Sequence, residues 1–389
     1  MVYLKWSLSA LRVSVGNGAN LTYLVPMLSL NRTAKIVAVL FVTNLVGGCA
    51  MAVANHISVS PTQSASPTVS YQSAPLTGLQ FAEGTNNFLS GPVVMGKIDN
   101  SPEARPQLGL SQADIVIDEM VEGGLTRFLA IWHSNMPTQF GPIRSVRPMD
   151  PDLATAFGGI INYSGGQKPF VAAMKATGIY NADETSEVGK GTMTRVTNRV
   201  APHNLFVNAQ VQQGKHLDLA APKPFLTFSP EKETSMAGVM GKPVADVKAK
   251  FPAATALWTW NGRAFLRTQD GKSLTDALDG SQISAQNVLV LRVAVDRSFR
   301  DPRYGFVPKT LLEGTGKGQV FSDGKVIDVT WTKNSASSYV QLDATNGQPV
   351  TLAPGNTWFE LVPSDVGSVT VDYVAAVKNA TTASPKPSK

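Results

Sequence analysis

Val93-Val94-Met95-Gly96-Lys97-Ile98 runs directly into Asp99-Asn100-Ser101-Pro102, and this stretch decides the fold expected for the first half of the chain. Short apolar, β-branched runs that stop at Asn, Ser and Pro are typical of buried strands. Working outward, we predict further strands at 114–118 (Asp-Ile-Val-Ile-Asp) and at 127–132, with a turn at Gly123-Gly124 between them. The first region is therefore expected to contain a sheet.

Helical signals alternate with these strands. Asp150 suits a helix N-cap, Pro151 the first helical position and Gly158 the C-terminal stop. Residues 160–163 are expected to return as a strand and residues 169–177 to form a second helix. Strands that alternate with helices predict a mixed α/β sheet in this region.

The second region carries a different pattern, because short β-rich runs are punctuated by hairpin dipeptides. Asn-Gly and Asp-Gly are the strongest short-range hairpin signals, and they occur at Asn261-Gly262, Asp270-Gly271, Asp323-Gly324 and Asn346-Gly347. We therefore expect an α+β protein in which an N-terminal mixed α/β sheet domain is followed by a mainly antiparallel β domain.

Composition divides the chain further. Residues 50–78 are rich in Ser, Pro, Thr, Ala and Gln, a composition that is typical of a flexible tether. A short helix is expected near 244–250, within a linker. The predicted segments are a signal peptide (1–48), a lipid-anchored tether (49–78), an N-terminal α/β domain (79–219), a linker (220–252), a C-terminal β-rich domain (253–375) and a disordered tail (376–389).

Cys49 is the only cysteine of the chain, and it ends the lipobox-like sequence Val46-Gly47-Gly48-Cys49. Before it lies an apolar run over 36–46, preceded by Arg32 and Lys35, as in a secretory signal. The run is too short to span a bilayer, which needs about 20 apolar residues. We predict a protein anchored through lipid (palmitate) on Cys49 to the outer face of the cytoplasmic membrane, with translation starting at Met27.

The formal net charge of +6 does not indicate a nucleic-acid partner. The predicted signal peptide holds four basic residues and no acidic ones, so the chain after it has 30 basic and 28 acidic residues and a net charge of +2. Such a balance provides no electrostatic footprint for nucleic acid. With one cysteine no internal disulfide can form, so hydrophobic cores must supply the stability.

Two arginines, Arg144 and Arg147, precede the predicted helix at Asp150. A helix N-terminus favours anions, and the guanidinium fork matches phosphate or carboxylate. The alternative is that both arginines form structural ion pairs with Asp150, Asp152 or Glu119. The sequence leaves both possibilities open.

A second polar cluster contains Arg195, Arg199, His203 and Asn204. The two arginines are four residues apart and would share one face of a helix. Pro202 would end such a helix and place His203 on a loop, where it could act as a general acid or base. The alternative is a turn histidine bonded to the backbone.

Arg127 and the carboxylates Asp99 and Asp150 complete the candidate site. Carboxylates beside arginines could hold a hydrated Mg²⁺ and a phosphate, so Asp99 and Asp150 are the candidate metal ligands and His203 and Asp150 the candidate catalytic groups. We expect no cofactor otherwise, since the sequence has neither zinc-ligand spacing nor a Gly-x-Ser-x-Gly elbow.

Several motifs together resemble those of the YerB-like family of bacterial lipoproteins, a two-domain family of unknown function. The resemblance spans residues 85–373 and is carried by Lys97-Ile98-Asp99-Asn100, Glu122-Gly123-Gly124-Leu125-Thr126-Arg127-Phe128, Gly141-Pro142-Ile143-Arg144-Ser145-Val146-Arg147, Ala201-Pro202-His203-Asn204-Leu205 and Gly355-Asn356-Thr357-Trp358. It implies a lipid-anchored envelope protein and no particular activity. The segment order is also similar to that of LytR-CpsA-Psr phosphotransferases, which implies polyprenyl phosphate as a ligand.

Three hypotheses follow. The first is a non-catalytic envelope lipoprotein that binds an anionic or glycan ligand through Arg127, Arg144, Arg147, Arg195, Arg199, His203 and Asn204. The second is a metal-assisted phosphotransferase or hydrolase acting on lipid-linked envelope phosphates. The third is a scaffold that docks an unidentified protein partner through exposed aromatics such as Trp258 and Trp331. The lack of an identifiable nucleophile favours binding over catalysis without deciding between them.

Overall fold

The computed structural model of the 389-residue chain describes residues 6–15, 19–28, 69–303 and 305–374. The chain forms two units, residues 1–65 and 66–389. In the first, β1 (Trp6–Val15) and β2 (Ala19–Leu28) form an antiparallel hairpin. The lipobox at Cys49, most of the predicted tether and the predicted tail lie outside the described residues, and the start at Met27 stays a prediction.

One long sheet crosses the second unit. β5 pairs in parallel with β9 and antiparallel with β7, so the sheet contains both strand directions. Its strands, in spatial order, are β10 (Tyr180–Asp183), β9 (Ile160–Tyr163), β5 (Val94–Asp99), β7 (Thr126–Trp132), β6 (Ile115–Met120), β27 (Thr357–Pro363), β19 (Asn287–Asp296), β23 (Gly314–Ser322), β24 (Lys325–Lys333) and β25 (Gln341–Ala344).

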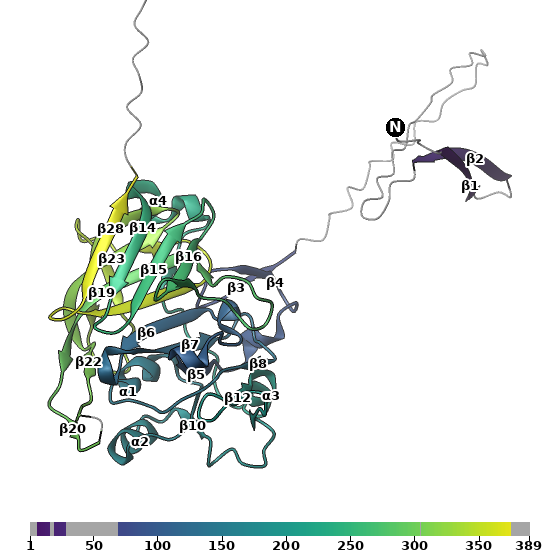
Figure 1. Cartoon of the computed structure of the whole chain (residues 1–389). Helices are drawn as coiled ribbons and strands as arrows, with labels where there is room; N and C mark the ends of the chain where they lie inside the picture. The colour runs from purple at the N-terminus through teal and green to yellow at the C-terminus, as the bar shows by residue number, and fades with distance from the viewer. Residues whose placement is uncertain (1–5, 16–18, 29–68, 304, 375–389) are drawn as a thin grey trace, which may run out of the picture. The chain divides into compact units, whose positions relative to one another are not determined.

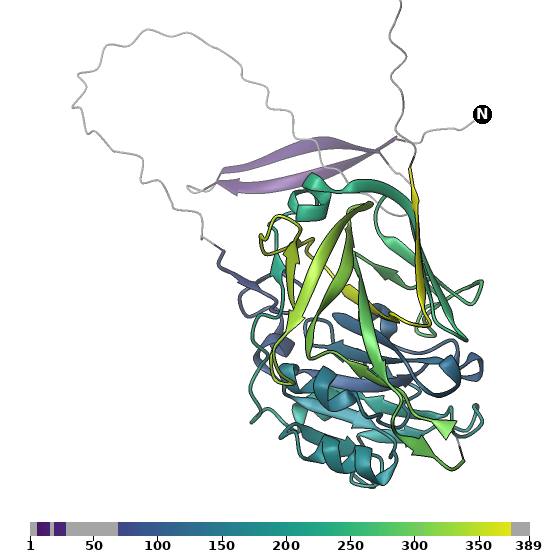
Figure 2. The ribbon, with the colours of Figure 1, turned by 90° about the vertical axis from the view of Figure 1, so that its left-hand side faces the viewer.

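The pairing of β6 with β27 joins the two halves of the sequence. The two strands run parallel, from Ile115 opposite Thr357 to Glu119 opposite Leu361. In both views the blue strands of the first region therefore lie beside green and yellow strands of the second (Figures 1 and 2). The two predicted regions thus share one hydrogen-bonded sheet.

A second set of antiparallel strands packs within the C-terminal region. It contains β28 (Ser368–Tyr373), β14 (Lys242–Lys250), β15 (Thr255–Trp260), β16 (Phe265–Gln269), β17 (Lys272–Ser273) and β18 (Ser284–Ala285). The helix expected near 244–250 is wrong, because this segment is strand β14. Val247 and Ala249 are buried while Lys248 and Lys250 are exposed, which is the period-two pattern of a strand.

Helices are few and short. α1 (Asp150–Ala154) continues as a 3₁₀ turn (Thr155–Phe157) that ends at Gly158 in the left-handed region, with φ of 65°. The residue before α1 is Met149, so Asp150 is the first helical residue and not the N-cap we expected. The others are α2 (Lys168–Lys175), α3 (Ala209–Gly214) and α4 (Met236–Met240). Within the described residues, no helix is long and apolar enough to cross a membrane.

The central strands β5, β6 and β7 are buried along their whole length. Alternate residues serve two hydrophobic clusters, so that Phe128 and Ala130 join one and Leu129 and Ile131 the other. A sheet covered on both faces has little room for charge, yet these strands carry Lys97 and Arg127. Buried charges need partners, and those partners build the site described below.

The tryptophans proposed as docking groups belong to the core. Trp258, Trp331 and Trp358 are all buried. Trp258 and Trp358 also pack edge to face, with ring centroids 5.2 Å apart. The aromatic surface that motivated a scaffold function is therefore absent at these three positions.

Candidate functional site

Four segments meet at one end of the strands β5 and β7. Asp99 ends β5 and lies directly opposite Arg127 near the start of β7. The chain after the Gly141-Pro142 turn runs beside β5, where the Arg144 N–H donates to the Lys97 carbonyl at 2.8 Å. The Ile143 N–H in turn donates to the Leu205 carbonyl at 2.9 Å, which brings the loop before Leu205 to the same place. Backbone pairing thus gathers side chains that are far apart in the sequence.

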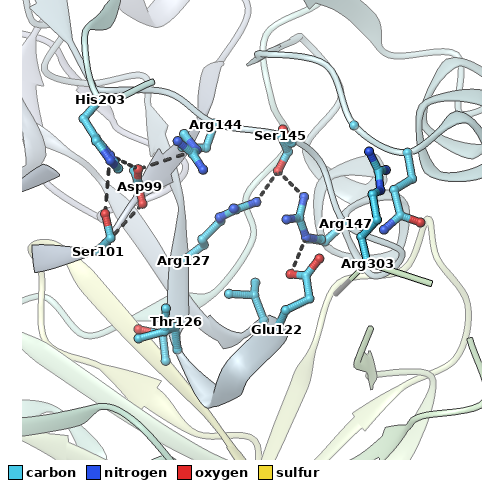
Figure 3. A pocket seen from close by; sticks show the side chains of 14 residues that line it. Asp99, Ser101, Glu122, Thr126, Arg127, Arg144, Ser145, Arg147, His203 and Arg303 are labelled. Atoms are coloured by element: carbon cyan, nitrogen blue, oxygen red, sulfur yellow. Dashed lines mark hydrogen bonds and ion pairs between the residues drawn. The ribbon is translucent and has the colours of Figure 1, made fainter. Parts of the chain in front are cut away.

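These segments enclose a cavity of about 440 Å³ (Figure 3). Four of its lining residues are arginines and two are carboxylates. Its lining residues are Asp99, Ser101, Val121, Glu122, Leu125, Thr126, Arg127, Arg144, Ser145, Arg147, Gly166, Gln167, His203 and Arg303. The site is therefore an electropositive cavity.

Asp99 contacts three other groups of the cavity. Its Oδ2 lies 2.7 Å from His203 Nδ1 and 3.6 Å from Arg144 Nε, and its Oδ1 accepts from the Ser101 N–H at 3.1 Å (Figure 3). Burial alone would raise the pKa of Asp99, but the positive charges of Arg144 and Arg127 and the hydrogen bonds from Ser101 and His203 outweigh it and lower the pKa. Asp99 is therefore a carboxylate that orients His203 and Arg144.

Arg144 is the least satisfied cation of the cavity. Its Nη1 is buried, yet no hydrogen-bond acceptor in the described part of the chain reaches it. Its Nε has only the long contact with Asp99. Leaving a buried charged donor unsatisfied costs free energy, so such a group is typically explained by a missing partner.

The side chain of Arg127 is fixed by a hydrogen bond to a backbone carbonyl. Its side chain is buried, and Nη1 donates to the Ser145 carbonyl at 3.0 Å. Burial and the like charges of Arg147 and Arg144 lower the pKa of Arg127 to about 9, partly offset by Asp99 and Glu122. The guanidinium still carries its charge at neutral pH, in surroundings where a further anion would be favourable.

Arg147 is more fully paired. Its Nε donates to Glu122 Oε2 at 2.7 Å and its Nη1 to the Val146 carbonyl at 3.0 Å. Burial would raise the pKa of Glu122, but the charge and hydrogen bond of Arg147 dominate and lower it. Of the arginines before α1, Arg147 therefore matches the ion-pair alternative, with Glu122 as a partner that the sequence did not suggest.

Asp150 lies beneath the cavity and does not line it. Its Oδ1 accepts from Lys97 Nζ at 2.8 Å and its Oδ2 from the Arg147 N–H at 2.5 Å. Lys97 is fully buried and also pairs with Glu119. Burial lowers the pKa of Lys97 to about 8, although the charge and hydrogen bond of Asp150 oppose this. Both oxygens of Asp150 are thus engaged by neighbouring donors, and its metal-binding and catalytic roles stay predictions.

The second arginine cluster supports the site from outside. Arg195 is the last residue of strand β11 (Met193–Arg195), not part of a helix, and forms a two-bonded pair with Glu184 at 2.7 and 2.8 Å. Arg195 also donates to Asn204 Oδ1 at 2.6 Å, while Arg199 donates to the Ala104 and Pro106 carbonyls. None of Arg195, Arg199 and Asn204 lines the cavity. They fix the loop that carries His203.

Arg303 is the lining residue that sequence reasoning missed. It lies between the short strands β20 (Arg300–Asp301) and β21 (Gly305–Phe306), in the second region. No local motif connects it with Arg144, because only the folded chain brings the two regions together. Among the described residues, no group of three or more His, Cys, Asp or Glu side chains is placed to hold a metal ion.

Comparison with known proteins identifies the family. Models of the N-terminal and C-terminal domains of "Protein of unknown function (DUF3048)" match residues 76–220 and 247–359. The chain belongs to the DUF3048 family. "Putative lipoprotein YerB" of Bacillus subtilis (strain 168) is 29% identical over 306 residues, which cover 76% of this chain and 88% of the relative.

A solved DUF3048-type structure also resembles the chain. The crystal structure of YerB from Bacillus subtilis matches with a TM-score of 0.65 and 26% identity, over 77% of this chain and 99% of that one. These matches confirm the resemblance to the YerB-like family that the motifs indicated. They support a strand-rich fold with the two-part DUF3048 layout, and they attach no ligand or reaction to the cavity.

Proposed function

We propose that this DUF3048 protein is an envelope lipoprotein that binds an anionic group in the arginine cavity. The observation that carries the proposal is Arg144 Nη1, a buried donor without an acceptor in the described chain, inside a cavity that also receives Arg127. A phosphate or carboxylate oxygen would complete its hydrogen bonding. The name of the Bacillus subtilis relative supports the lipoprotein part, with Cys49 as the anchor and the outer face of the cytoplasmic membrane as the location.

The arginines of the cavity have different roles in the proposed binding. Arg147 is neutralised by Glu122 and braced by backbone carbonyls. Arg127 is fixed by Ser145 and oriented along the wall. Because these side chains are already ordered, an incoming anion loses little affinity to immobilising them, which is the advantage of a preorganised site. We therefore assign Arg127 and Arg144 as the principal anion-binding residues and Arg147 as a positioning residue.

The test is calorimetric titration of the protein with inorganic phosphate and with pyrophosphate. Replacing Arg144 by Gln removes a charge-assisted bond worth about 1.5–3 kcal/mol, so we expect affinity to fall roughly 10- to 100-fold. Arg263→Gln is the matched control, because Arg263 is exposed on a hairpin of the second region. If Arg144→Gln and Arg127→Gln both bind phosphate like the wild type while remaining folded by circular dichroism, the assignment fails.

Hydrolysis of a phosphate ester is the second candidate, and the Asp99–His203 pair favours it. Asp99 accepts from Nδ1 of His203 at 2.7 Å, and no bond to a described residue occupies Nε2. A carboxylate that holds a histidine in this way is a common arrangement for acid–base catalysis. Hydrolysis of a phosphate ester that is abolished by His203→Gln but retained by Arg263→Gln would establish this second function. Binding of phosphate without hydrolysis of the ester, with or without Mg²⁺, would exclude it.

A further inference from the structure

The cavity has an apolar side that anion binding alone does not explain. The turn between β6 and β7 contributes Val121 and Leu125 to the lining, and Leu125 is 39% exposed. The Val121 N–H donates to the Leu125 carbonyl at 2.8 Å, so the two residues close one tight loop. A large apolar side chain is thus presented beside the charged groups.

This apolar side is held rigidly. The Ala253 N–H donates to the Gly124 carbonyl at 3.0 Å, and a Cβ on Gly124 would lie 2.6 Å from the Pro252 side chain. Gly124 also has a φ of 74°, which only glycine adopts easily. The turn is therefore clamped against the second region, and Leu125 keeps its place beside the cavity whether or not a ligand is bound.

The lining also argues against a neutral glycan. Within the described residues that line the cavity there is no Trp, Tyr or Phe to stack on a sugar ring. A neutral ligand would also cover the arginines without balancing their charge, which is unfavourable for buried cations. The surplus of arginines over carboxylates in the lining instead matches an anionic head such as a phosphate monoester.

We infer that the ligand is a phosphate monoester carried on an apolar chain, with its head between Arg127 and Arg144 and the start of its chain against Leu125 and Val121. The inference rests on the proposed function, because it names the class of anion that the same cavity takes. A phosphate monoester on an apolar chain could be a lipid headgroup in a bilayer or a free alkyl phosphate.

The experiment compares inorganic phosphate with butyl and octyl phosphate, titrated below their aggregation limits. Each methylene that is buried contributes about 0.8 kcal/mol, or about fourfold in affinity. We therefore expect octyl phosphate to bind at least tenfold more tightly than inorganic phosphate. Octanol, which lacks the head, should not bind. Leu125→Ala should reduce the gain from chain length several-fold and leave the affinity for inorganic phosphate unchanged.

Leu278→Ala is the matched control, since Leu278 is exposed and lies outside the cavity. If inorganic phosphate binds and depends on Arg144 but chain length has no effect, the inference is overturned and the proposed function stands. If none of the phosphates binds, the proposed function itself fails.

Sedimentation with phosphatidylcholine vesicles, with and without phosphatidic acid, shows whether the ligand is a bilayer lipid or a free alkyl phosphate. Arg144-dependent binding to phosphatidic acid vesicles indicates recognition in the bilayer. Binding of octyl phosphate without binding to the vesicles indicates a free amphiphile. Both results uphold the inference, and vesicle binding that Arg144→Gln leaves unchanged contradicts recognition of the headgroup in this cavity.

Discussion

Arg144 and Arg147 are three residues apart and have opposite roles. Arg147 meets Glu122 at 2.7 Å, whereas Arg144 has only a 3.6 Å contact with Asp99. The difference comes from the partners, because Glu122 follows β6 and faces Arg147 across the cavity wall. A structural ion pair therefore lies next to an arginine whose charge is available for a ligand.

The sequence predicted some of the residues that line the cavity and missed others. Arg144, Arg147, Arg127, Asp99 and His203 were all candidates, and the fold brings them to one cavity. Local motifs could suggest them because they lie at strand ends and beside turns, where functional residues concentrate. Motifs could not find Arg303, which comes from another region. Nor could they show that Glu184 and backbone carbonyls bind Arg195 and Arg199, because these partners depend on tertiary contacts.

At the residue scale, His133 is expected to make the protein sensitive to acid. The side chain is buried, with Nε2 3.2 Å from the Gly91 carbonyl, and burial lowers the pKa of His133 to about 4. The unfolded histidine, with its ordinary pKa near 6.5, takes up a proton first. The contribution of neutral His133 to the free energy of unfolding is therefore fully present above about pH 6.5. It is lost as the pH falls towards 4, and amounts to roughly 3 kcal/mol.

Urea unfolding at pH 7.0, 5.5 and 4.5 measures this dependence. In a His133→Gln variant the fall in unfolding free energy between pH 7.0 and 4.5 should be smaller than in the wild type. An identical fall in both proteins would show that His133 is not the group responsible.

At the element scale, the loop around Asp276 fastens the second region to the first. Its Oδ1 accepts from the Gly109 N–H at 2.9 Å and its Oδ2 from the Ser111 N–H at 2.8 Å, and the carboxylate is buried. Removing it leaves backbone donors without acceptors, which costs about 1–3 kcal/mol for each buried group. The clamp on the β6–β7 turn by Pro252 and Ala253 is a second fastening of the same kind.

We therefore expect Asp276→Ala to lower the free energy of unfolding by about 2–4 kcal/mol. Asp279→Ala is the control three residues away, because Asp279 is exposed and accepts from the Ser281 N–H within its own turn. Denaturant titration of both variants makes the comparison. Equal stability of the two would mean that the contact between the regions contributes little.

Elements with strong local signals were predicted well, and those decided by distant partners were not. The expected helix at 169–177 corresponds to α2 (Lys168–Lys175), where apolar residues recur at helical spacing. The segment 244–250 lacks helical spacing of its apolar residues, and its pairing with β15 and β28 makes it a strand. Tertiary context overrides weak propensity in this way.

At the scale of the whole molecule, a buried charge cluster lies where the two regions meet. Arg267 donates to Asp118 at 2.6 Å and also to Glu360, and its guanidinium lies 4.7 Å from the Trp358 ring centroid. Burial, followed by the charge of Glu360, raises the pKa of Asp118 to about 8. Asp118 thus has a structural partner, Arg267, in the other half of the chain.

A fragment that ends at residue 240 should therefore fail to fold on its own. It would expose the parallel edge of β6, which is buried throughout, and leave Asp118 without Arg267. Breaking a buried ion pair in this way costs about 3–5 kcal/mol, which is a large part of the stability of a domain. Thermal melting followed by circular dichroism is the measurement, and a cooperative transition in the fragment would refute the expectation.

The β6–β27 pairing also limits when the central sheet can form during synthesis. β27 begins at Thr357, long after β6 ends at Met120, so the central sheet cannot close until the long segment between them has been made. Contacts between segments so distant in sequence give a high contact order and slow folding. If the chain is exported before it folds, as our proposal implies, this delay would leave the early strands unpaired during translocation. Completion of the central sheet would then wait for β27.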